Sequence, residues 1–121
     1  MKTIQVTENR RIGDGEEPFI IAEIGNNHNG DMGVARELVH RAKEVGVDAV
    51  KFQKKDIETA FPQELLNKPY AGPSSFGQTY REHKEALELT IEQLAELKGL
   101  ADELGLTSFA TPFDAPSVDV C

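Results

Sequence analysis

The chain reads PFIIAEIGNNHNGDMGVARELVHRAKEVGVDAVKFQ from residue 18 to residue 53, two β-branched runs around one amphipathic repeat. The first run, 18–25, ends at a glycine and a polar loop, which predicts a buried strand followed by a loop. Asp31 is a predicted N-cap, and apolar residues then recur every three or four positions up to Val45, which predicts a helix over 31–45. The second run, 47–53, predicts another strand. Strand, helix and strand joined this tightly form a βαβ unit, whose crossover makes the two strands parallel.

The alternation continues after a long interruption. Residues 54–90 have no sustained period and are broken by prolines and glycines, which predicts a long loop of the kind that usually carries function, with a short helix over 80–89. A clear helix is predicted from Thr90, which forms a capping box with Gln93, to Leu104. A third strand is predicted over 107–111, and Asp114 is the predicted cap of one more helix. The fold class is therefore α/β, with parallel strands alternating with helices.

Composition excludes several classes of protein. With 121 residues, 39% of them hydrophobic and 28% charged, the chain has the make-up of one globular domain. Its 13 Lys and Arg against 21 Asp and Glu give a formal charge of −8, so nothing supplies the broad basic face that nucleic acid or an anionic membrane surface requires.

Membrane insertion and secretion are also not expected. The longest apolar run, Phe19–Ala22, is four residues long, and residues 1–11 lack the apolar core and cleavage site of a signal peptide. The single cysteine, Cys121, excludes an internal disulfide and a cysteine-rich metal site. We therefore expect a cytoplasmic protein.

Polar side chains interrupt the predicted strands near their carboxyl ends, where parallel α/β sheets and barrels place reactive groups. Glu23 lies in an apolar run, which is costly unless the carboxylate is used or is paired in a buried salt bridge with Lys51. Lys51 and Gln53 share one strand face and suit an anion held by the ammonium and oriented by the amide. Thr111 is a weaker candidate, as a hydroxyl donor at the end of the third strand.

The remaining polar candidates have ordinary alternatives. His28 lies alone in a loop, where a histidine is more often solvated or a hydrogen-bonding strut than a metal ligand, and no two histidines have metal-ligand spacing. Lys54 and Lys55 are expected at a solvated loop edge, with a secondary role in attracting anions. Several long-loop residues suit either a lid or sugar pocket, or simple packing of the loop: Phe76, Tyr80, Arg81, His83 and Lys84.

Four segments, in order along nearly the whole chain, resemble the N-terminal part of the sialic acid synthase family, which includes N-acetylneuraminate, legionaminic and pseudaminic acid synthases. They read AEIGNNHNG at 22–30, AKEVGVDAVKFQ at 42–53, GQTYREHK at 77–84 and ATPF at 110–113. The third segment is more similar to the animal-type synthases and the spore-coat polysaccharide relatives than to some bacterial neuraminate synthases.

The resemblance implies a (β/α)₈ TIM barrel that condenses phosphoenolpyruvate with an N-acetylated amino sugar, such as N-acetylmannosamine, into a nine-carbon 2-keto sugar and phosphate. It also implies a divalent metal, Mn²⁺ or Mg²⁺, that polarises the sugar aldehyde. By carry-over, Lys51 and Thr111 contact the phosphoenolpyruvate anion, Gln53 orients ligand nearby, and Glu23 faces the sugar and the metal. Three further residues match substrate-binding segments of the family: Asn27, His28 and Tyr80.

A (β/α)₈ barrel needs roughly 250 residues, so residues 1–121 are expected to form only its N-terminal portion. The resemblance places the metal ligands, the rest of the barrel and an antifreeze-like domain in sequence absent here, and it implies a homodimer for the full-length enzyme. The chain alone is then expected to be inactive. Two alternatives stay open: a non-catalytic half-barrel that binds or assembles with a partner, and another phosphoenolpyruvate-using barrel synthase.

Overall fold

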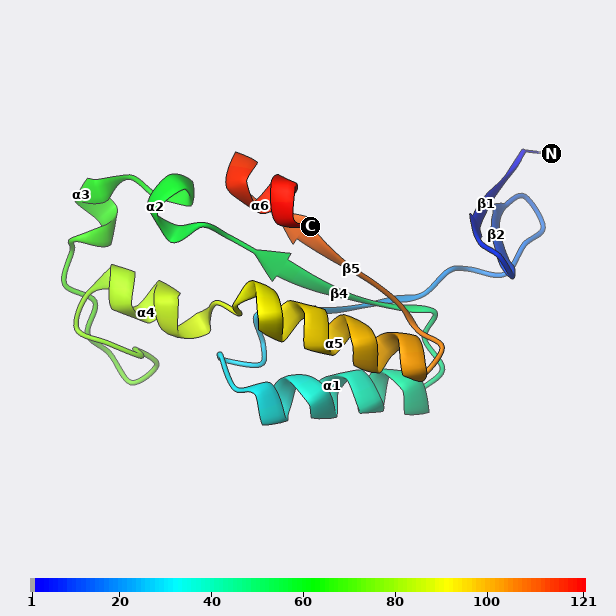
Figure 1. Cartoon of the computed structure of the whole chain (residues 1–121), viewed down its shortest axis with the longest axis horizontal. Helices are drawn as coiled ribbons and strands as arrows, with labels where there is room; N and C mark the ends of the chain where they lie inside the picture. Colours follow the sequence, from blue (N-terminus) through cyan, green and yellow to red (C-terminus); the bar gives the residue numbers. More distant parts are fainter. Residues whose placement is uncertain (1) are drawn as a thin grey trace.

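The computed structural model describes residues 2–121 and contains a three-stranded parallel sheet in the order β3-β4-β5. The strands are β3 (Ile21–Gly25), β4 (Ala49–Lys54) and β5 (Thr107–Pro112). Helices α1 (Met32–Glu44) and α5 (Ile91–Glu103) lie side by side along the sheet (Figure 1). The three strands, the two long helices and their parallel connection are therefore confirmed.

The two long helices begin and end as their sequences indicate. The Asp31 side chain accepts from Val34 N at 3.1 Å and caps α1, while Thr90 and Gln93 form the capping box of α5. Gly46 and Gly105 follow the helices with φ of 80° and 72°, a left-handed conformation that glycine adopts without steric cost.

The sheet has a covered face and an open face. Alternate residues of the strands pack against α1 and α5 in one hydrophobic core, which includes Ile24, Val50, Phe52, Val39 and Leu97. The opposite face leaves Ile21 and Phe109 exposed among the described residues. The prediction of a buried strand over 18–25 is only partly confirmed, since β3 begins at Ile21, Ile24 is buried, and no described element covers the second face of the strand.

Residues 54–90 contain more helix than the sequence predicts. The single-turn helices α2 (Ile57–Ala60) and α3 (Gln63–Leu66) precede α4 (Tyr80–Leu87), and only α4 was anticipated. All three lie beyond the carboxyl end of β4, while α6 (Ala115–Val120) follows β5 (Figure 1). The Asp114 side chain caps α6 by accepting from Ser117 N at 2.8 Å, which confirms the predicted helix start.

An N-terminal hairpin was not predicted. Strands β1 (Thr3–Thr7) and β2 (Arg10–Gly13) pair antiparallel and lie at the opposite end of the sheet from α2, α3 and α4 (Figure 1). Arg10 connects this hairpin to the sheet through a 2.9 Å ion pair with Asp48. The sequence does carry a signal for β1, since polar and apolar residues alternate over 3–7, whereas the four residues of β2 are too few to show a period.

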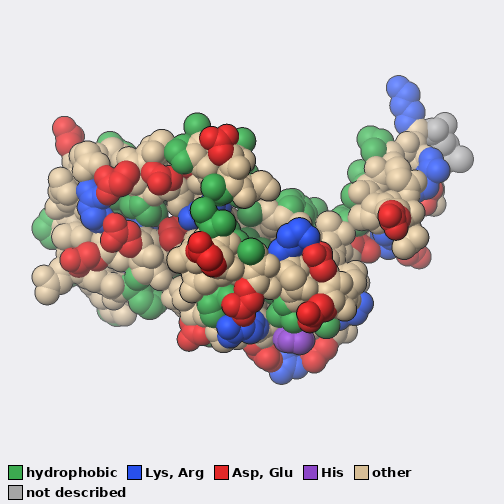
Figure 2. Space-filling view, in the orientation of Figure 1, with side chains coloured by type: hydrophobic (Ala, Val, Ile, Leu, Met, Phe, Trp, Pro, Cys, Tyr) green, Lys and Arg blue, Asp and Glu red, His purple; other side chains and the backbone are tan. Residues whose placement is uncertain are grey.

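The described surface matches the charge of the chain. Acidic side chains are scattered between lysines and arginines over the helical face, with no continuous basic patch on this side (Figure 2). No helix within residues 2–121 is long and apolar enough to cross a membrane.

Candidate active site

The open face of the sheet brings together the polar residues singled out at the strand ends. Glu23 lies opposite Lys51 in the β3–β4 register, and Gln53 lies opposite Thr111 in the β4–β5 register. Lys51 Nζ is 2.7 Å from Glu23 Oε2, so the predicted ion pair forms. It is not buried, however, since the side chains are 30% and 46% exposed. The reason is that both point toward the uncovered face rather than into the helical core.

Gly25 creates the space in which Glu23 and Gln53 approach each other. Its φ is +57°, and a Cβ placed on it would lie 3.1 Å from Gln53 Nε2 and 3.3 Å from Glu23 Oε1. A larger residue would therefore press on both polar groups. Gly25 is thus required both for the left-handed backbone of the turn and for the space that the Glu23 and Gln53 side chains occupy.

Lys55 joins this group, contrary to the expectation of a solvated loop edge. Its Nζ donates to Gln53 Oε1 at 2.8 Å and lies 4.2 Å from the centre of the Phe113 ring. Burial lowers the pKa of Lys55, and Lys84 adds to this effect, against the opposing attraction of Glu88 and Asp114. The one sequence signal for Lys55 was that it continues the two-residue spacing of Lys51 and Gln53, which extends the same face beyond the strand end.

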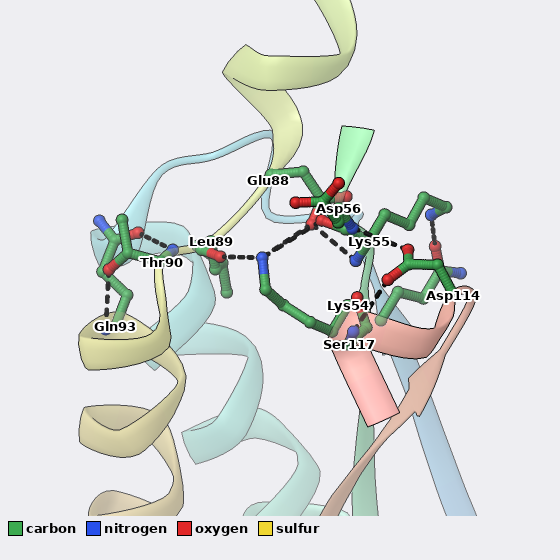
Figure 3. Close-up of polar contacts among 10 residues, drawn as sticks. Lys54, Lys55, Asp56, Glu88, Leu89, Thr90, Gln93, Asp114 and Ser117 are labelled. Atoms are coloured by element: carbon green, nitrogen blue, oxygen red, sulfur yellow. Dashed lines mark hydrogen bonds and ion pairs between the residues drawn. The ribbon is translucent and has the colours of Figure 1, made fainter. Parts of the chain in front are cut away.

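The Lys54 side chain points away from that of Lys55, and it too does not lie at a solvated loop edge (Figure 3). Its Nζ donates to Leu89 O at 3.2 Å and to Lys55 O at 3.3 Å, and it lies 3.6 Å from Glu88 Oε2. The Lys54 and Glu88 side chains are only 15% and 14% exposed. Glu88 also accepts from Lys55 N at 3.1 Å, and burial raises its pKa. Sequence reasoning missed Glu88, which lies at the α4–α5 junction.

Asp114 links the two neighbouring strand ends. Besides capping α6, it accepts from Asp56 N at 2.7 Å, so the segment after β4 is held against the segment after β5 (Figure 3). Together, Glu88 and Asp114 fix the backbone on either side of Lys55. These hydrogen bonds therefore fix the backbone that carries Lys55 at the end of the open face.

Asn27 and His28 shape the loop after β3. His28 is buried, and its Nδ1 accepts from Gly30 N at 3.0 Å, which confirms a hydrogen-bonding strut. Burial also lowers the pKa of His28, in keeping with an unprotonated Nδ1. Asn27 Nδ2 donates to Ile24 O at 2.9 Å.

Tyr80 belongs to a separate aromatic cluster. Its ring makes edge contacts with Phe61 at 5.6 Å and Tyr70 at 5.5 Å between centroids. His83 stacks between Tyr70 and Phe76, and its Nδ1 accepts from Phe76 N at 3.2 Å. These contacts confirm that the aromatic residues pack the long loop against α4.

The described residues do not form a metal centre. No three His, Cys, Asp or Glu side chains within residues 2–121 are grouped so as to hold a metal ion. Glu23, the carboxylate on the open face, is paired with Lys51.

Comparison with known proteins gives a consistent result. The model of the NeuB family matches residues 38–121. The N-acetylneuraminate-9-phosphate synthases of Mus musculus and Homo sapiens are each 40% identical over 116 residues, covering 96% of this chain and 32% of each relative. The N,N'-diacetyllegionaminic acid synthase of Legionella pneumophila is 44% identical over 104 residues, covering 84% of this chain and 29% of the relative.

A solved structure shares the fold. The N-acetylneuraminic acid synthetase of Leptospira borgpetersenii, crystallised with citrate, superposes with a TM-score of 0.74 at 27% identity. The match covers 98% of this chain and 37% of that one. The chain thus spans about a third of the length of the curated relatives it matches.

Proposed function

The chain belongs to the NeuB family, and we propose that it supplies part of the active site of a sialic-acid-type synthase. The reaction is the condensation of phosphoenolpyruvate with an N-acetylated amino sugar to give a nine-carbon 2-keto sugar and phosphate. The observation that carries the proposal is the row of polar side chains on one face of the strand ends, made of Glu23, Lys51, Gln53, Lys55 and Thr111.

Charge supports the assignment of the anionic substrate to this row. A chain of formal charge −8 repels phosphoenolpyruvate unless local cations hold it, and Lys51 is a partly exposed ammonium on the open face of β4. Its partner Glu23 lies 2.7 Å from Lys51 Nζ on the same open face. We assign Lys51 to the phosphate or carboxylate of phosphoenolpyruvate.

The neutral groups next to Lys51 suit hydrogen bonding to the same substrate. Gln53 and Thr111 are neighbours in register and supply an amide and a hydroxyl. Glu23 is placed on the side of β3, where its carboxylate would orient the hydroxyls of the sugar. In the proposed reaction C3 of phosphoenolpyruvate bonds to the sugar aldehyde carbon, water adds at C2, and the C2–O bond to phosphate breaks.

The metal expected for the family is not assigned to this chain. One carboxylate engaged with Lys51 does not fit a divalent cation site, and no described cluster of potential ligands takes its place. We propose that Mn²⁺ or Mg²⁺ is held by residues of the complete protein outside this chain.

The complete architecture is likewise a proposal. A three-stranded parallel sheet with one uncovered face fits the first part of a (β/α)₈ barrel, whose interior would be lined by the open face. We propose that the remaining barrel, a C-terminal antifreeze-like domain and a second subunit complete the active site.

Phosphate release tests the proposal. The complete protein is mixed with phosphoenolpyruvate, Mn²⁺ and one of three sugars: N-acetylmannosamine, its 6-phosphate, or a dideoxy diacetamido hexose. We expect inorganic phosphate to appear in step with a 2-keto acid for one of them. Absence of phosphate with all three sugars refutes the proposed function.

A further inference from the structure

The carboxamide of Gln53 has two chemically different ends, and the structure places them in different surroundings. Oε1 accepts from Lys55 Nζ at 2.8 Å. Nε2 lies at the other end, 3.1 Å from the position that a Gly25 Cβ would take, and Glu23 Oε1 is 3.3 Å from that same position. An ammonium group only donates hydrogen bonds, so it selects the oxygen end of the amide.

We propose that Lys55 is a positioning residue that fixes the Gln53 carboxamide with its N–H donors toward the space above Gly25. There the donors meet an acceptor oxygen of the anionic substrate. A reversed amide would present an oxygen to that substrate and repel it. The inference rests on the proposed function, because it takes Gln53 as a substrate-binding group.

Lys55 is available for this role because the acids around it are occupied. Glu88 is engaged by Lys54 and by Lys55 N, and Asp114 by the backbone N–H groups of Asp56 and Ser117. Within residues 2–121 Lys55 makes no salt bridge of its own. The Phe113 ring, 4.2 Å from Nζ, further restricts the ammonium to the Gln53 side.

Kinetics of the complete enzyme test the role. Lys55→Met keeps the apolar stem and removes the donor, so we expect KM for phosphoenolpyruvate to rise about tenfold, with kcat within about twofold. Lys55→Arg restores a donor and is expected to recover KM to within about threefold of wild type. An unchanged KM in Lys55→Met overturns the proposal.

A double-mutant cycle separates positioning from direct binding. In a Gln53→Ala background Lys55 has no amide to orient, so adding Lys55→Met should change KM by less than about twofold. If the tenfold loss persists in that background, Lys55 contacts the substrate itself and the positioning role is wrong. Lys68→Met, an exposed lysine outside the site, is the matched control.

A spectroscopic readout keeps the inference testable apart from activity. In protein labelled with ¹⁵N-glutamine, the Gln53 side-chain NH₂ pair should be sharp and well separated in wild type and Lys55→Arg. It should broaden or shift toward free-amide values in Lys55→Met. An unaltered NH₂ pair in Lys55→Met refutes the positioning role of Lys55. An inactive wild-type enzyme refutes the proposed function instead, and this spectrum still decides whether Lys55 positions the Gln53 carboxamide.

Discussion

Lys54 and Lys55 are adjacent in sequence, yet the fold gives their ammonium groups different surroundings. Lys54 Nζ has two carbonyl oxygens and the Glu88 carboxylate around it, in a largely buried position. Lys55 Nζ has the Gln53 amide oxygen and an aromatic ring. The first group is fully used in joining β4 to the α4–α5 junction, whereas the second holds a polar side chain of the open face.

The difference shows that successive residues at the end of β4 have different roles: those on one face stabilise the fold, and those on the other face are available to bind a ligand. Alternation sends Lys51, Gln53 and Lys55 to the open face and Lys54 to the helical side. A buried charge needs an opposite charge and several hydrogen bonds, and only the helical side provides them. Variants on the two sides should therefore affect different measurements.

The largest effect is expected on the open face, for Lys51→Ala. Removing the ammonium should weaken phosphoenolpyruvate binding by about 100-fold, because the anion loses its charged partner. The free energy of unfolding should change by less than about 1 kcal/mol, since the pair with Glu23 is partly exposed. Isothermal titration calorimetry and urea denaturation of the complete protein measure the two quantities. Unchanged affinity would remove Lys51 from the anion site.

Glu88 on the helical side should show the opposite pattern. Glu88→Ala removes the carboxylate that pairs with Lys54 Nζ and accepts from Lys55 N, so we expect a loss of about 2–3 kcal/mol in unfolding free energy. Glu88→Gln keeps an acceptor oxygen and should cost less than about 1 kcal/mol. Affinity for phosphoenolpyruvate should stay within about threefold of wild type in Glu88→Gln.

The pH dependence of the Glu88 variants sharpens this prediction. Burial raises the pKa of Glu88 in the folded state above its ordinary 4.5. The folded state thus binds more protons than the unfolded state, and the contribution of Glu88 is present below pH 4.5 and lost as pH rises through the folded pKa. The unfolding free energy of wild type relative to Glu88→Gln should therefore decrease as pH rises from 4.5 through the folded-state pKa of Glu88. A relative stability that rises instead contradicts the assigned burial cost.

The sequence predicted the parts of this arrangement that depend on local periodicity. Alternation along two strands was enough to bring Glu23, Lys51 and Gln53 to one face, and capping residues located the long helices. Lys55 N and Glu88 meet only because the chain returns after 33 residues of aperiodic sequence. Single-turn helices such as α2 and α3 are too short to show a period, whereas the alternation over 3–7 was a usable signal for β1.

The smallest effect is expected for His83, a buried group of α4 that contacts the preceding loop. Its imidazole accepts from Phe76 N at 3.2 Å, which requires an unprotonated Nδ1. Burial, with a smaller contribution from Lys84, lowers its pKa below the ordinary 6.5, so the folded state binds fewer protons than the unfolded state. Its contribution is complete above pH 6.5 and is lost as pH falls through the lowered folded-state pKa, by about 1 kcal/mol.

His83→Gln isolates that contribution, because a side-chain amide oxygen can accept from Phe76 N without titrating. Urea denaturation at a series of pH values below 6.5 should show a shallower loss of stability in His83→Gln than in wild type. The part that remains is expected from His28, whose pKa burial also lowers. Identical profiles for wild type and His83→Gln would mean that the loop does not depend on an unprotonated imidazole, and that aromatic packing alone holds it against α4.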